Sequence, residues 1–204
     1  MKFVRMEIEN FQSATQLSMD FSIDPKKKLT VIRAENGFGK TTLHAAFRWA
    51  VFGKNGLKKD KRGLEKISHF DLATEEGKNI TVTVRLKFQT TPRRGNPQIY
   101  EINRKANIIV KKEQESDGNW VTRETRVGSE KLELLHLENN NWNPVAHPEN
   151  KLEGFFPFRT KEIFFVDGDH LTDLIQVDSQ RRMFQVENSI SYLLQLDRFS
   201  DAIK

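Results

Sequence analysis

Alternation of apolar and polar positions near the start of the chain predicts two short strands. The alternation covers residues 2 to 8 and again residues 17 to 23, as in strands that are half buried. The pieces NFQSATQ and DPKKK, between and after them, have loop composition. A mostly apolar stretch, LTVIR at 29 to 33, predicts a third strand that runs directly into a glycine-containing loop.

The stretch TTLHAAFRWAVFG, residues 41 to 53, predicts a buried helix that ends at Gly53. Its apolar residues recur at helical spacing and share one face: Leu43, Ala46, Phe47, Ala50 and Val51. A second, amphipathic helix is predicted for residues 178 to 203, with inward positions at Met183, Val186, Ile190, Leu193 and Leu194.

A strand-rich region lies between these helices. The stretches ITVTVRLKF, QIYEINRKANIIVKK, WVTRETRV and KLELLHL, separated by turn sequences, predict an antiparallel meander. We therefore expect a β-rich subdomain at approximately 78 to 137. The following ENNNWNPVAHPEN is expected to be a loop, and KEIFFVDGD, at 161 to 169, a buried strand that enters a glycine turn.

Composition excludes several classes of site. The 204 residues contain no cysteine, so disulfides and thiolate metal sites are excluded, and a reducing cytoplasm is the expected compartment. The N-terminus has no signal-peptide pattern, and the apolar runs are too short for a membrane span. The five histidines lack metal-ligand spacing and are expected at surface or packing positions. The net charge of +5 permits an anionic partner.

The loop AENGFGKT, residues 34 to 41, matches the phosphate-loop pattern Gly-x-x-x-x-Gly-Lys-Thr except for Ala34. Such a loop cradles phosphates with backbone N–H groups, its lysine reaches the outer phosphates, and its Thr41 hydroxyl binds Mg²⁺. An alanine at position 34 costs about 1–2 kcal/mol only if its backbone is left-handed. A glycine turn that binds nothing is the alternative. The predicted nucleotide-binding residues are Asn36, Gly37, Phe38, Gly39, Lys40, Thr41 and Thr42.

The segment EIFFVDGDHL, residues 162 to 171, permits more than one interpretation. As a Walker B strand it would place Asp167 near Mg²⁺ in a stand-alone P-loop kinase or GTPase. Asp167 could instead cap a turn together with Gly168. A family resemblance gives the third interpretation.

The order of motifs resembles the N-terminal lobe of SMC-like ABC ATPases, and within them the DndD-type ATPases of DNA phosphorothioation systems. The matching motifs are Asn10-Phe11, Glu35-Asn36-Gly37 and Phe165-Val166-Asp167-Gly168-Asp169. The closing SISYLLQLDRFSDAIK is similar to the helix that precedes the coiled coil in that family, so the resemblance spans the whole chain.

The resemblance implies an α/β P-loop NTPase fold: an ABC-type half-head with a mixed sheet around the phosphate-loop helix and an antiparallel β-subdomain. Residues 1 to 204 would form this lobe. It also places Asp167 at the position of the Q-loop glutamine, where a hard carboxylate oxygen suits Mg²⁺. The chain departs from the family at Gln12, where many relatives carry arginine, and at Asp169, where they carry glutamate.

No ABC signature motif, and no apolar strand that ends in Asp-Glu, occurs in these 204 residues. The resemblance implies that both lie in a C-terminal lobe beyond a coiled coil, and that ATP is sandwiched between two heads of a homodimer. We therefore expect this chain to bind ATP with Mg²⁺ but to hydrolyse it poorly alone. The implied partners are that lobe, a second head, DNA, and other proteins of a DNA modification or anti-phage defence system. An SMC-like double-strand-break repair ATPase and a nucleotide-sensing interaction module without turnover are the alternatives.

Two basic regions allow either DNA contact or ordinary solvation. The first is the loop at 54 to 66. The second is the meander, whose cations are Arg85, Arg93, Arg94, Arg104, Lys105, Lys111, Lys112, Arg123 and Arg126. The three tryptophans, Trp49, Trp120 and Trp142, are expected to be packing residues rather than base-stacking platforms.

Overall fold

The computed structural model describes residues 1–24, 26, 29–33, 35, 39–57, 66–92, 95–114 and 118–161. The chain divides into two units, Met1–Glu149 and Asn150–Lys204, which are described separately. Of the predicted strand at 161 to 169 only Lys161 belongs to the described residues, and the predicted helix at 178 to 203 lies outside them.

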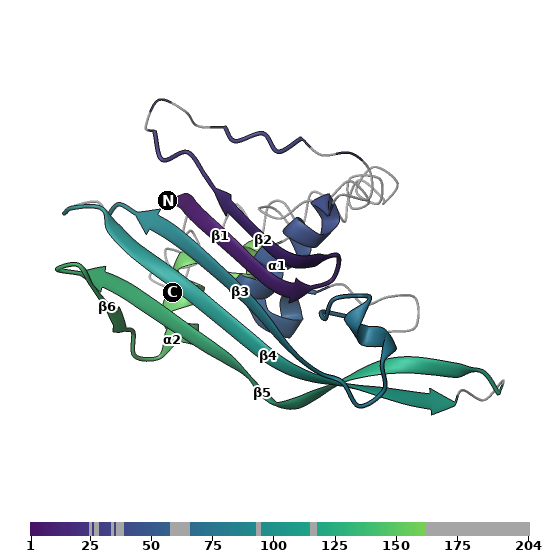
Figure 1. Ribbon diagram of the computed structural model, residues 1–204. Coiled ribbons are helices and arrows are strands. Elements are labelled where there is room, and N and C mark those ends of the chain that lie inside the picture. Colours follow the sequence, from purple (N-terminus) through teal and green to yellow (C-terminus); the bar gives the residue numbers. More distant parts are fainter. Residues whose placement is uncertain are drawn as a thin grey trace, which may run out of the picture. The chain divides into compact units, whose positions relative to one another are not determined.

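Six strands of the first unit form one sheet in the order β2-β1-β3-β4-β5-β6 (Figure 1). Every neighbouring pair among these described strands is antiparallel. The strands are β1 (Lys2–Phe11), β2 (Ala14–Asp20), β3 (Asn79–Thr90), β4 (Gln98–Gln114), β5 (Trp120–Glu138) and β6 (Asn141–Pro144).

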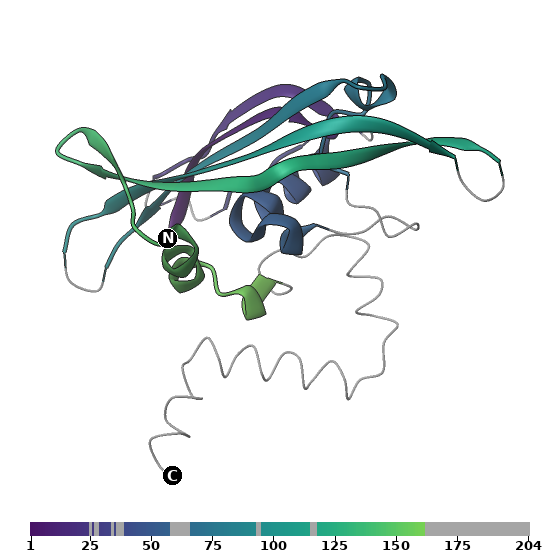
Figure 2. The same ribbon diagram turned by 90° about the horizontal axis from the view of Figure 1, so that it is seen from below.

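The meander is formed as its alternation predicted, with one difference. The stretches WVTRETRV and KLELLHL belong to a single strand, β5, which continues through Gly128 at a φ of 76°. The pairing of β4 with β5 shifts register between Lys105 and Asn107, and this bulge accommodates the glycine. The far ends of β4 and β5 pair only with each other and extend as a hairpin past the other strands (Figures 1 and 2).

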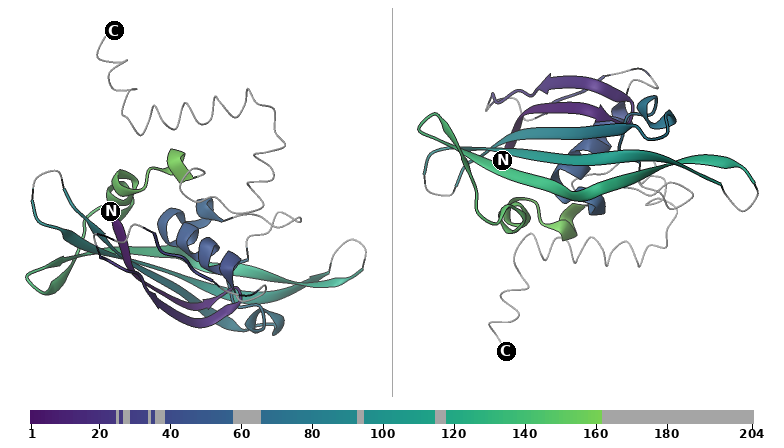
Figure 3. Two further views of the ribbon diagram at one scale, coloured as in Figure 1. Left: turned by 90° about the horizontal axis from the view of Figure 1, so that it is seen from above. Right: turned by 60° about the horizontal axis from the view of Figure 1, so that its bottom comes forward.

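Helix α1 (Lys40–Phe52) lies against one face of this sheet (Figures 2 and 3). Of the predicted face, Leu43, Ala46, Ala50 and Val51 are buried and Phe47 is half-buried, and Trp49 joins them with no exposed surface. The Trp49 ring packs on Phe11 of β1 at 5.5 Å between centroids. Helix α1 ends at Gly53, whose φ of 60° favours glycine, and a 3-10 turn, η1 (Gly53–Gly56), follows. The α/β fold class predicted from the sequence is confirmed.

The prediction of a strand at 29 to 33 is wrong. These residues have no regular secondary structure, and the side chains of Leu29 and Val31 are 79% and 77% exposed. A strand requires a hydrogen-bonding neighbour, and no described strand pairs with this stretch. The parallel pairing expected of a mixed sheet around α1 is therefore not found among the described strands.

The prediction of a loop after residue 138 is also wrong in part. The described chain turns at Asn139 and Asn140, with φ of 49° and 62°, and returns as β6. Two consecutive residues with positive φ are the requirement of a type I′ hairpin turn, which asparagine tolerates. Helix α2 (Pro148–Phe155) then begins within the stretch predicted as loop.

The remaining described elements are short. The 3-10 turn η2 (Leu72–Thr74) precedes β3. In the second unit, the backbone N–H of Phe156 donates to Leu152 O at 2.7 Å, and the turn η3 (Phe158–Thr160) follows α2. Among the described residues, no helix combines the length and the apolar character needed to cross a membrane.

Candidate phosphate-binding site

The backbone at the N-terminus of α1 is suited to an anion. Gly39 precedes the helix at a φ of 84°, a left-handed conformation that glycine adopts without strain, and its carbonyl accepts the N–H of Leu43 at 2.8 Å. No side chain caps this end, and the first turn contains no acidic residue. The positive end of the helix dipole is therefore not neutralised by a carboxylate of the helix itself, which favours an anion.

Lys40 folds back over the loop that precedes it. Its ammonium Nζ donates a hydrogen bond of 3.0 Å to the carbonyl oxygen of Glu35, and both residues are exposed. A neutral carbonyl is a weaker partner for an ammonium than a charged phosphate oxygen. The lysine can therefore exchange this acceptor for a phosphate.

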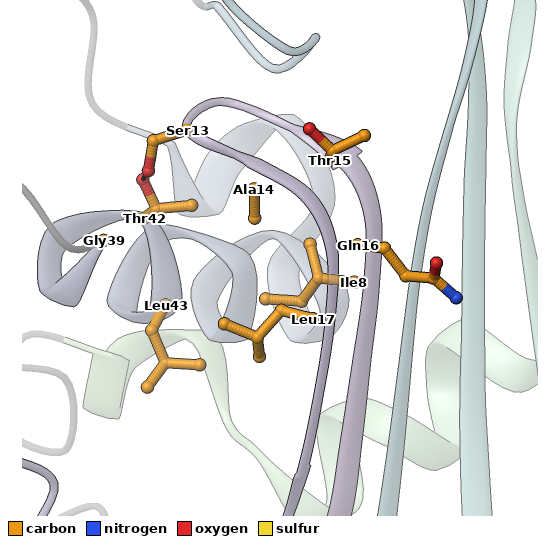
Figure 4. Close-up of a pocket in the computed structure, with 9 residues that line it drawn as sticks. All are labelled: Ile8, Ser13, Ala14, Thr15, Gln16, Leu17, Gly39, Thr42 and Leu43. Atoms are coloured by element: carbon orange, nitrogen blue, oxygen red, sulfur yellow. Dashed lines mark hydrogen bonds between the residues drawn. The ribbon is translucent and has the colours of Figure 1, made fainter.

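The two threonines that follow Lys40 have different surroundings. Thr41 is exposed, whereas Thr42 is 5% exposed and shares a hydrogen bond of 2.7 Å with the Ser13 hydroxyl (Figure 4). Ser13 lies in the turn between β1 and β2. A Cβ at Gly39 would lie 3.4 Å from Ser13 Oγ, so the turn also approaches the loop backbone closely. Ser13 was not among the predicted site residues, although it lies in a polar turn directly after the Asn-Phe pair.

A pocket of about 320 Å³ adjoins this contact, between the β1–β2 turn and the start of α1 (Figure 4). One part of its lining is apolar and comes from Ile8, Leu17 and Leu43. The other part is polar or small and comes from Ser13, Ala14, Thr15, Gln16, Gly39 and Thr42. Such a mixture suits a ligand with an apolar ring and several polar groups.

Gln12, at the position where many members of the resembled family have arginine, binds main chain. Its side-chain amide donates to Lys66 O at 3.1 Å, its backbone N–H donates to Ile67 O at 3.0 Å, and its carbonyl accepts the N–H of Phe70 at 2.9 Å. The residue thus holds the segment that follows the basic loop.

The structure brings Gly39, Lys40, Thr41 and Thr42 together at the start of α1. Ala34, the predicted site residues Asn36, Gly37 and Phe38, and the predicted metal ligand Asp167 lie outside the described residues. Their roles stay predictions. Residues 58–65 of the basic loop also lie outside the described part.

Several cations of the meander are compensated by carboxylates. Arg85 lies 3.1 Å from Glu7 and 3.5 Å from Glu9 across the sheet, and Arg123 lies 3.0 Å from Glu113. These arginines therefore offer less positive charge to DNA than the sequence suggested.

The tryptophan prediction is confirmed for Trp49, which is fully buried. Trp120 is 67% exposed and does not fit the prediction, whereas Trp142 is 37% exposed and lies against a lysine. Lys87 Nζ lies 5.1 Å from the centre of the Trp142 ring, a cation–π contact that places this ring at the surface of the sheet.

Comparison with protein families matches residues 5–204 to a family described as AAA domain. The chain belongs to this family. The P-loop NTPase fold expected of the AAA domain agrees with two features of the structure. Gly39 directly precedes the buried helix α1, and this helix packs on a β-sheet.

No curated protein matches this AAA domain. Among solved structures, it is similar to a chain from "Structural biochemistry of ATP-driven dimerization and DNA stimulated activation of SMC ATPases". That similarity has 15% sequence identity and a TM-score of 0.46, and it covers 92% of this chain and 98% of the solved one. The fold assignment therefore rests on the family match and on the described elements, and not on this similarity.

Proposed function

We propose that this AAA domain binds ATP, with the triphosphate at the N-terminus of α1, and acts as the N-terminal lobe of an SMC-like ATPase. One observation carries the proposal. Gly39, Lys40, Thr41 and Thr42 meet at an uncapped helix start, beside a pocket of about 320 Å³. The backbone N–H groups, the ammonium and the hydroxyls there are the groups that a polyphosphate requires.

Each described residue has a defined task in this proposal. Gly39 gives the left-handed turn that aims the loop backbone at the phosphates, with Asn36, Gly37 and Phe38 as the preceding loop residues. Lys40 exchanges the Glu35 carbonyl for the outer phosphates. Thr42 lies in the first turn of the helix and offers its backbone N–H to the phosphates, while its side chain is held by Ser13. The adjoining pocket receives part of the nucleoside.

Magnesium is part of the proposal because a triphosphate needs a counter-ion at the reacting phosphates. Thr41 presents an exposed hydroxyl in the first turn of α1, a hard oxygen of the kind that Mg²⁺ prefers. We propose Thr41 and Asp167 as its protein ligands. When bound, the ion would offset the negative charge that develops on the phosphates.

A complementary lobe is the proposed partner. The stretch 29–33 leads towards the phosphate loop with Leu29 and Val31 exposed, and no described strand pairs with it. An apolar segment that pairs with no described strand suits a strand supplied by a C-terminal lobe. Hydrolysis would then require that lobe and a second head, and ATP would control closure of the dimer.

The biological role that we propose is DNA processing in a phosphorothioation or related defence system. The Phe165-Val166-Asp167-Gly168-Asp169 and Glu35-Asn36-Gly37 motifs support it because they resemble the DndD-type pattern. Gene neighbours that encode a sulfur-transfer enzyme would support this role. ATP binding without turnover by the complete protein, with or without DNA, would instead indicate a nucleotide-sensing module.

The ATP site is tested by Lys40→Ala, measured as the affinity for a fluorescent ATP analogue. We expect binding to be abolished because the ammonium that reaches the outer phosphates is lost. Lys78→Ala is the matched control, since it removes the same charge from a surface pair with Glu75 away from the loop. An unchanged affinity of the Lys40→Ala protein would reject the phosphate-loop assignment.

The metal ligand is tested by Asp167→Ala in the same assay, with Mg²⁺ and with a chelator. We expect the variant to lose affinity mainly in the presence of Mg²⁺, because the carboxylate would contact the metal rather than the nucleotide. An equal loss with and without Mg²⁺ would reject Asp167 as a ligand.

A further inference from the structure

The C-terminal end of α1 is held by a buried arginine of the sheet. Arg104 of β4 is 8% exposed, and its Nε donates to the carbonyl of Ala50 at 3.0 Å while Nη2 donates to that of Val51 at 3.4 Å. The last carbonyls of a helix have no partner within the helix, and they form the negative end of its dipole. Arg104 provides hydrogen-bond donors for two of these carbonyls and a positive charge beside the negative end of the dipole.

Glu130 of β5 connects this arginine to the helix by a second route. Its Oε2 accepts Arg104 Nη1 at 3.4 Å, and its Oε1 accepts the Trp49 indole N–H at 3.1 Å and Arg126 Nη1 at 2.5 Å. Gly53 leaves room for this group, because a Cβ there would lie 2.9 Å from Arg104 Nη1 and from Glu130 Oε2.

This cluster joins one carboxylate, that of Glu130, to two guanidinium groups, those of Arg104 and Arg126. Burial lowers the pKa of the Arg104 guanidinium from its ordinary value, and the neighbouring Glu130 opposes that shift. Arginine nevertheless stays protonated at neutral pH, so the carboxylate faces two cations.

The N-terminal end of α1 is also connected to β5. Ser13 binds Thr42, and its neighbour Gln12 is hydrogen-bonded to the main chain at 66, 67 and 70. Glu124 of β5 accepts the backbone N–H groups of Ile67 and Ser68 at 3.0 and 3.3 Å and the Ser68 hydroxyl at 2.7 Å. A continuous chain of contacts thus runs from the first turn of α1 to β5.

From these contacts we infer that Glu124 and Glu130 are positioning residues of the nucleotide site, which hold the two ends of α1 from one strand and so set where Lys40 and Thr41 at its start lie. The inference rests on the proposed ATP binding. Apolar packing along α1 is non-directional and permits small shifts along the helix axis. Hydrogen bonds at both ends are directional and do not permit them.

The experiment compares Glu130→Gln, Glu124→Gln and the double variant with Glu133→Gln in the full chain. Glu133 is a matched control because it lies on the same strand but accepts Asn103 Nδ2 at 3.0 Å, at a position opposite Asn103 in the β4–β5 register. The measurements are the affinity for a fluorescent ATP analogue and, without nucleotide, the hydrogen exchange of the first hydrogen-bonded amides of α1, those of residues 43 to 45.

We expect each single variant at 124 or 130 to weaken binding about fivefold, because small displacements of binding groups are costly. The double variant is expected to lose more, and Glu133→Gln is expected to bind as the unmodified chain does. Exchange of the Leu43–Ala45 amides, which are the first ones bonded within this helix, should rise in Glu130→Gln, although the substitution lies at the opposite end of the helix.

Unchanged affinity in Glu130→Gln, alongside lost binding in Lys40→Ala, would overturn the inference and leave ATP binding intact. Faster exchange confined to the last turn of α1 would also overturn it, because a local structural role predicts that result. If the unmodified chain does not bind the analogue, the proposed function fails, and the exchange data still test the positioning. Arg126→Gln, which removes one donor to Glu130, replaces Glu130→Gln in both measurements if that protein does not fold.

Discussion

Gln12 and Ser13, two neighbours in the β1–β2 turn, have different tasks. Ser13 binds the first turn of α1, whereas Gln12 binds main chain at 66 to 70. Gln12 has a φ of 48°, which is uncommon for a residue other than glycine, asparagine or aspartate. At the scale of the residue, backbone geometry therefore decides which side chain faces the nucleotide site.

Glu7 is a residue whose environment predicts a pH dependence. Hydrogen bonds from Arg5 Nε at 2.7 Å and from Arg85 Nη1 at 3.1 Å hold the pKa of the Glu7 carboxyl below its ordinary value of 4.5. A carboxyl with a lowered folded-state pKa stabilises the fold above its unfolded pKa. That contribution is lost as the pH falls from about 4.5 through the lower folded-state pKa.

We therefore expect Glu7→Gln to remove part of the acid sensitivity of the protein. Between about pH 5 and about pH 3, where carboxyl groups titrate, the melting temperature should fall more steeply for the unmodified chain than for the variant. Thermal denaturation followed by circular dichroism across this range is the measurement. Parallel pH profiles for the two proteins would contradict the prediction.

At the scale of the element, the β5–β6 hairpin depends on its two turn residues. Glu138 pairs with Asn141, so the loop consists of Asn139 and Asn140, both with positive φ. The Asn-Asn pair was a readable turn signal, because asparagine tolerates this conformation. It was missed because the four residues of β6 include a proline and lack clear alternation.

Asn140→Ala is expected to destabilise this hairpin by about 1 kcal/mol, because a Cβ without a compensating polar group is unfavourable at positive φ. Asn140→Gly should be neutral or stabilising, and Asn143→Ala in β6 serves as a control with ordinary strand geometry. Chemical denaturation gives the free energies of unfolding. An equal loss in Asn140→Gly and Asn140→Ala would show that φ is not the cause.

At the scale of the whole molecule, several charges on the described sheet surface are compensated by neighbouring charges. The chain has a net charge of +5, yet Arg5, Glu7 and Arg85 form a continuous ion-paired row, and Lys87 lies 3.7 Å from Glu101. A count of arginines and lysines alone therefore overstates the positive charge that the meander offers, because strand register places opposite charges beside each other.

The sequence by itself determined the elements whose signals are local. Alternation predicted β1 and β3, and helical spacing predicted α1, because neighbouring residues contain all of that information. The order Gly39, Lys40, Thr41 is a signal of the same local kind, and the phosphate binding that it indicates stays a prediction. The strand predicted at 29 to 33 failed because a strand also needs a distant partner.

Only the tertiary structure decided which distant residues meet. The Ser13–Thr42 hydrogen bond spans 29 positions, and Trp49 and Glu130 are 81 positions apart. Such contacts depend on the register of β4 and β5 and on where α1 lies against the sheet. No local pattern encodes them, because strand pairing and helix packing are set by the joint burial of the apolar faces.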